Sequence, residues 1–146
     1  MQDEYDDRPE FVTTEAVVQA YKASEPIFSG LLAEIRELSK KKPEATMSPG
    51  KVKIINRVLA DLLAFLKDQP QGKYLEELDD KSLPQVSDAL LVMVQFKTAL
   101  SSFASRHRRS DVYGSSAYWV TEEHLQAEAE EYSEDEDEDY SDEADT

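Results

Sequence analysis

The sequence contains no cysteine, which excludes disulfide bonds, thiolate catalysis and zinc sites built on cysteine. Its longest unbroken apolar run, ALLVMV, is far shorter than the ~20 residues that a membrane-spanning helix needs. The first ten residues, MQDEYDDRPE, are acidic and lack the apolar segment of a signal peptide. We therefore expect a soluble, cytoplasmic protein that makes no membrane contact.

Catalytic motifs are also missing. The sequence has no HExxH, no GxSxG and no glycine-rich phosphate loop. The two histidines, His107 and His124, lie in a basic cluster and an acidic segment, and neither has the setting of a catalytic triad. Neighbouring carboxylates such as Glu76 and Glu77 are typical of a solvated surface. We expect no enzymatic activity, no catalytic residue and no cofactor.

The acidic C-terminal segment resembles a calcium-binding loop only in part. Asp135, Asp137 and Asp139 match the first three ligands of an EF-hand. Tyr140 then stands where the loop requires glycine, and Thr146 where it requires glutamate. The sequence therefore predicts no specific metal site.

Charge is distributed very unevenly along the chain. The net charge is −16, made up of −4 in residues 1–10, +3 in residues 11–110 and −15 in residues 111–146, where there is no Lys or Arg. We expect four parts: a disordered acidic N-terminus (1–10), a mildly basic folded region (11–110), an aromatic loop with a short acidic helix (111–131), and a disordered acidic tail (132–146).

The folded region shows helical periodicity throughout. One pattern starts at Thr13, is broken or kinked at Pro26 and continues to the lysines at 40–42. Ser48 and Pro49 predict the N-cap and first position of a second helix, and Pro84 opens a third pattern of about 25 residues. The second helix carries an apolar seam that is broadened by Ile54, Val58, Leu63 and Phe65. The short connections predict an all-α fold: a small antiparallel bundle of three to five helices.

The segment after the bundle carries the candidate partner-binding residues. Thr121 is a predicted helix cap, with Glu122 and Glu123 in the first turn. Tyr118 and Trp119 either dock on the bundle or anchor a partner, and the short helix would then order only on binding. The full predicted set is Tyr113, Tyr118, Trp119, Leu125 and Tyr132.

Basic residues form a second candidate surface. If the third helix returns toward the loop that joins the first two, nine bases converge at one pole of the bundle. The predicted pole consists of Lys40, Lys41, Lys42, Lys51, Lys53, Arg57, Arg106, Arg108 and Arg109. It would attract a nucleic acid, an acidic protein face or the chain's own acidic tail.

These patterns favour a non-enzymatic protein-binding module that engages a basic surface through its acidic C-terminal segment. By analogy of size and charge, it is similar to accessory or regulatory subunits, inhibitors and antitoxin-like proteins. The alternative is a nucleic-acid-associated protein, through the basic pole or through an acidic tail that blocks a partner's nucleic-acid site. The broad apolar helices also allow a homodimer.

Overall fold

The computed structural model describes residues 12–110, 116–131 and 133. Its contacts divide the chain into two units. One is Val17–Ser105, and the other combines Met1–Ala16 with Arg106–Thr146. The predictions of disorder for residues 1–10 and 132–146 lie outside the described residues, except at Ser133, which is helical.

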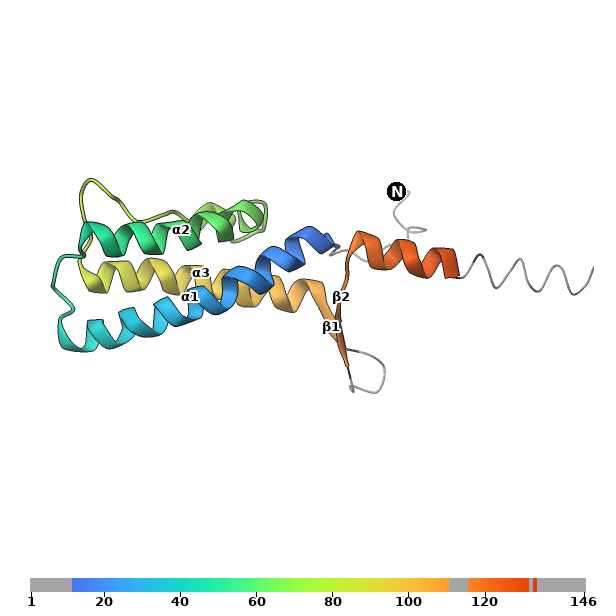
Figure 1. The fold of residues 1–146 in the computed structure, drawn as a ribbon, viewed down its shortest axis with the longest axis horizontal. Coiled ribbons are helices and arrows are strands. Elements are labelled where there is room, and N and C mark those ends of the chain that lie inside the picture. The colour runs from blue at the N-terminus through green and yellow to red at the C-terminus, as the bar shows by residue number, and fades with distance from the viewer. Residues whose placement is uncertain (1–11, 111–115, 132, 134–146) are drawn as a thin grey trace, which may run out of the picture. The chain divides into compact units, whose positions relative to one another are not determined.

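Three long helices, α1 (Glu15–Lys41), α2 (Pro49–Leu66) and α3 (Val86–His107), lie side by side and form the bundle of the first unit (Figure 1). A short 3-10 helix, η2 (Gly72–Tyr74), interrupts the connection between α2 and α3. The predicted helical bundle is confirmed.

The direction of α3 differs from the prediction. Val86 donates its backbone N–H to the carbonyl of Ala45 at 2.8 Å, and Met47 donates to the carbonyl of Pro84 at 2.8 Å. The start of α3 therefore lies beside the α1–α2 loop, and α2 and α3 run parallel to each other and antiparallel to α1 (Figure 1). The purely antiparallel order was wrong because residues 67–85 travel the length of the bundle before α3 begins.

The side chain of Asn56 holds this long connection against α2. Its Nδ2 donates to the carbonyl of Leu78 at 2.9 Å, and its Oδ1 accepts from the N–H of Leu78 at 2.8 Å. The Leu78 side chain is buried as well. One amide thus satisfies both backbone groups of a residue that has no regular secondary structure around it.

Aliphatic and aromatic side chains from all three helices fill the core. Phe28 of α1 meets Phe96 of α3, with ring centroids 6.5 Å apart, and Phe65 of α2 meets Phe103 of α3 at 5.2 Å. The largest fully buried side chains are Phe28, Phe96, Phe103, Met47, Ile55, Leu59, Leu62, Leu66, Met93, Val18, Val52 and Val86. Burial of this apolar surface is the main stabilising contribution to the bundle.

Local sequence signals at the helix starts are mostly confirmed. Ser48 caps α2 by accepting the N–H of Lys51 at 3.2 Å, and Pro49 occupies the first turn. Pro26, in contrast, lies inside α1, which continues to Lys41 without a break. A proline in a helix removes one backbone hydrogen bond. Phe28 and Leu32 of the same helix are buried, and such burial stabilises α1 within the bundle.

The second unit contains a small hairpin that the sequence did not predict. Strand β1 (Arg108–Ser110) pairs antiparallel with strand β2 (Ala117–Trp119). Residues 117–119 are therefore a strand, where we expected a polar loop. The signal was weak because each strand has only three residues.

Candidate functional site

The acidic segment begins as a capped helix over residues 122–131. Thr121 accepts the N–H of His124 through its Oγ1 at 3.0 Å, as predicted for a cap. Glu122 and Glu123 lie in the first turn, where negative charge is favoured by the helix dipole. Of residues 132–146 the structure describes only Ser133, which is helical and exposed.

Backbone hydrogen bonds fix the start of this helix within its unit. The N–H of Val120 donates to the carbonyl of His107 at 2.8 Å, and the carbonyl of Val120 accepts from Thr13 at 3.0 Å. Thr13 in turn accepts the N–H of Glu122 at 2.9 Å. Val120 and Thr121 are buried at this junction. The start of the helix is therefore hydrogen-bonded both to the last residue of α3 and to the segment that precedes α1.

A carboxylate of the acidic helix also caps the first residue of α1. Glu123 Oε2 accepts the backbone N–H of Glu15 at 2.9 Å. The first N–H groups of a helix have no partner within it, so this contact satisfies one of them across 108 positions of sequence. The sequence offered no signal for it, because neither residue type nor spacing singles out this pair.

Beyond this junction the helix presents carboxylates to solvent. Every residue of 126–131 is exposed, and the His124 Nε2 lies 3.2 Å from Glu128 Oε1 one turn along. The exposed acidic residues are Glu122, Glu123, Glu128, Glu130 and Glu131. The structure thus corrects the expectation that this segment orders only on binding, because its carboxylates already have helical spacing.

The two described aromatic residues of the site differ in exposure. Trp119 is half-buried, pairs with Arg108 across the hairpin, and lies with its ring centroid 5.8 Å from the guanidinium carbon of Arg108. Tyr118 is 40% exposed, and its ring centroid is 5.2 Å from that of His124. The fold therefore packs Trp119 and leaves Tyr118 accessible beside the acidic helix.

The remaining members of the predicted partner-binding set contribute little accessible surface. Leu125 is half-buried at the helix start. Tyr113 and Tyr132 lie outside the described residues. The accessible part of the candidate site thus consists of Tyr118 and the carboxylates of residues 122–131.

The predicted basic pole is divided. Lys41 and Lys51 line a groove between α1 and α2, whereas Lys53 and Arg57 line a separate hollow together with Glu77 and Asp80. Acidic residues therefore share the surface with the bases. Lys40 forms an ion pair with Glu37 at 2.9 Å, and both side chains are largely exposed.

The prediction that Arg106, Arg108 and Arg109 return to this pole assumed that α3 ends beside the α1–α2 loop. Because α3 starts beside the α1–α2 loop and extends about 33 Å over its 22 residues, its C-terminal end lies away from that loop. The prediction failed because it placed the start of α3 at the wrong end of the bundle.

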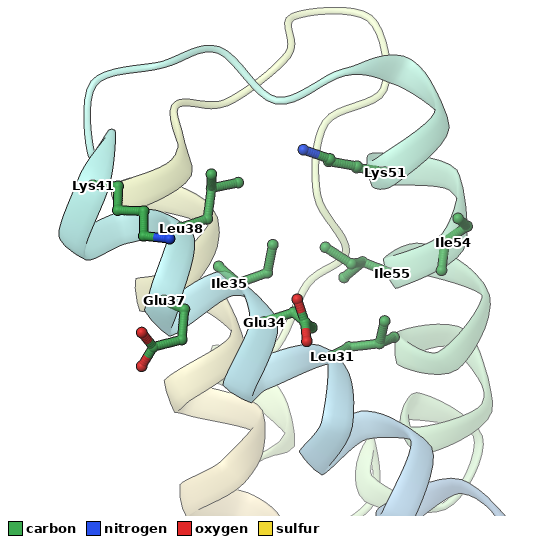
Figure 2. A pocket seen from close by; sticks show the side chains of 9 residues that line it. All are labelled: Leu31, Glu34, Ile35, Glu37, Leu38, Lys41, Lys51, Ile54 and Ile55. Carbon is green, nitrogen blue, oxygen red and sulfur yellow. The ribbon is translucent and has the colours of Figure 1, made fainter.

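An apolar groove between α1 and α2, of about 300 Å³, was not predicted. Figure 2 shows Leu31, Ile35 and Leu38 of α1 facing Ile54 and Ile55 of α2. Ile54 is 54% exposed, although its place in the apolar pattern had suggested burial. The groove carries two acidic and two basic side chains, namely Glu34, Glu37, Lys41 and Lys51.

Titratable groups offer little further chemistry. Within the described residues, no group of three or more His, Asp or Glu side chains is arranged to hold a metal ion. The N–H groups of Ser82 and Lys81 donate to the Asp79 carboxylate and hold its pKa below the ordinary 3.8. Asp79 is exposed in a turn, so this shift reflects local turn structure.

No family model, curated protein or solved structure matches this chain. None of the helices that the structure describes combines the length and the apolar character needed to span a membrane. The acidic helix, the hairpin and the bundle surface are the described features that bear on function.

Proposed function

We propose that this chain is a non-enzymatic protein-binding module, an accessory subunit or inhibitor, that engages a basic surface of another protein. Its binding element is the exposed acidic helix 122–131 together with the acidic residues that follow it in sequence. The observation that carries the proposal is the attachment of this helix: four backbone groups of the fold fix its start, while residues 126–131 are all exposed.

The charge distribution supports this role. Residues 111–146 carry 15 acidic residues and no Lys or Arg, while residues 11–110 have a net charge of +3. Like charges concentrated in one segment raise the rate of association with a basic surface and make it sensitive to salt. Tyr118 adds an exposed aromatic ring next to the helix, and tyrosine is a residue type enriched in binding hot spots.

A second candidate function is occupation of a nucleic-acid-binding site on the partner. Mimicry of phosphates needs negative charges at fixed spacing, and the helix supplies this for Glu128, Glu130 and Glu131. Direct binding of nucleic acid by the chain itself is less favoured, because the predicted basic pole is divided and mixed with acids.

Affinity capture from the source cell with charge-matched variants tests the proposal. Glu128→Gln/Glu130→Gln/Glu131→Gln removes three charges from the acidic helix, and Glu44→Gln/Glu76→Gln/Glu77→Gln removes three from exposed positions of the bundle unit. We expect the first variant to lose the main stoichiometric partner, because the partner's basic surface then faces fewer carboxylates, and the second to retain it. Equal capture by both variants would contradict the proposal.

The same complex distinguishes the second candidate. If the partner's surface is a nucleic-acid site, a DNA or RNA oligonucleotide should displace this chain, and this competition is best measured at low salt, where phosphates bind a basic surface most tightly. A complex that oligonucleotides do not disturb would leave only the protein-binding proposal.

A further inference from the structure

We propose that the α1–α2 groove is a self-association surface and that its occupant is a second copy of this chain. The groove belongs entirely to the bundle unit, away in sequence from the acidic helix. The proposal is independent of the function proposed above.

Apolar side chains at the groove are exposed to solvent in the single chain. Ile54, which lines the groove, is 54% exposed, and Ile27, which lies outside the lining two turns before Glu34 on α1, is 60% exposed. Leu31 and Leu38 are half-buried on the same side of α1, because residues 27, 31 and 38 recur at helical spacing. Contiguous apolar surface of this kind, bordered by charges, marks an interaction site.

Charge order along the groove identifies the occupant. The two bases, Lys41 and Lys51, lie at the end near the α1–α2 loop, and Glu34 and Glu37 lie farther along α1 (Figure 2). A two-fold axis through the groove near Ile54 would reverse this order in the second copy. The bases of each copy would then face the acids of the other, while the aliphatic side chains meet at the centre.

This arrangement is self-complementary, which is the requirement for an isologous dimer. A partner with charge of one sign would be attracted at one end of the groove and repelled at the other, because two bases line one end and two acids lie farther along. The helix face from Ile27 to Lys41 is about 21 Å long, which favours a small interface and a weak dimer.

The first test is sedimentation of the whole chain over a range of concentration. We expect a reversible monomer–dimer equilibrium that Ile54→Ser weakens by about tenfold or more, because it removes an apolar side chain from the centre of both halves. Leu91→Ser is the matched control: Leu91 is 65% exposed but lies on α3, outside the groove. It should leave the equilibrium unchanged.

Charge reversal gives a second, independent test. Glu34→Lys/Glu37→Lys and Lys41→Glu/Lys51→Glu should each abolish self-association, since each places like charges opposite one another across the two-fold axis. Mixing the two variants should restore a one-to-one heterodimer. Circular dichroism establishes that both variants retain their helices.

Three results would overturn the proposal. They are a wild-type chain that stays monomeric at several hundred micromolar, a dimerisation equilibrium that Ile54→Ser leaves unchanged, and charge-reversed variants that fail to associate when mixed. A monomeric chain whose groove instead binds a helix of another protein would assign the surface to a different occupant.

Discussion

Different interactions stabilise the bundle and the C-terminal acidic region, each within itself. In Val17–Ser105 the described structure rests on buried side chains from three helices, with Phe96, Phe103 and Leu59 all 0% exposed. In the C-terminal region the described contacts are mainly backbone hydrogen bonds, a hairpin of three pairs and two helix caps, and few side chains are buried. The bundle is therefore the stable scaffold, and the acidic helix is the easily perturbed part.

This difference suits a division of roles. Apolar burial provides most of the free energy of folding and tolerates changes of surface charge. A helix whose exposed residues are free of packing constraints can carry many carboxylates without destabilising a core. Local stability is low where few apolar contacts are made, and binding elements are commonly drawn from such regions.

The largest expected effect comes from a change in the bundle core. Phe96→Ala removes a ring that is 0% exposed and packs near Phe28, so we expect a loss of about 3–5 kcal/mol in the free energy of unfolding. Tyr74→Ala, at a 64% exposed position, is the control and should change it by under ~0.5 kcal/mol. Denaturant unfolding measures both, and a similar small effect for the two would refute the assignment of Phe96 to the core.

A medium effect, confined to the acidic helix, is expected from loss of its cap. Thr121→Ala removes the Oγ1 acceptor of the His124 N–H and should destabilise the helix by about 1 kcal/mol, while Thr121→Ser should retain most of that contribution. Amide hydrogen exchange should show faster exchange in residues 122–131 and unchanged protection in α2 and α3. Equal loss of protection in α2 and α3 would show that the acidic helix and the bundle lose their structure together.

The smallest effect concerns the turn at Asp79, at the surface of the bundle unit. Its folded pKa is lowered, so its contribution to stability is fully present above the unfolded value of 3.8 and is lost as pH falls through the lower folded value. An NMR titration of the carboxyl group should give a midpoint below 3.8 in the native protein, and Asp79→Asn should remove the corresponding acid dependence. A midpoint at or above 3.8 would show that the N–H groups of Lys81 and Ser82 do not hold the carboxylate.

Features that depend on neighbours in sequence were predictable. The Ser48–Pro49 start of α2 and the Thr121 cap follow from residue types within three or four positions, and both are confirmed. The apolar seams correctly gave a helical fold, because helical periodicity records which face is buried. Ile54 was the exception, since the pattern cannot distinguish a buried position from one at the edge of a seam.

Features that depend on distant contacts were not predictable. The direction of α3 is set by residues 67–85, which Asn56 holds through Leu78, 22 positions away. The hairpin depends on the pairing of Arg108 with Trp119, and the cap of α1 on Glu123. In each case the deciding partner lies beyond the three or four positions that a local sequence signal covers. The helices were therefore predicted correctly, whereas the basic pole and the aromatic loop were not.

Site-specific photo-crosslinking in the source cell tests the protein-binding role most directly. A crosslinking residue in place of Gln126, exposed on the acidic helix, is compared with one in place of Lys97, exposed on α3. We predict that position 126 crosslinks to one partner protein within a Lys- and Arg-rich peptide, and that position 97 does not. Crosslinks to that partner from position 97 alone, or none from position 126 under conditions where the complex forms, would contradict a binding role for the acidic helix.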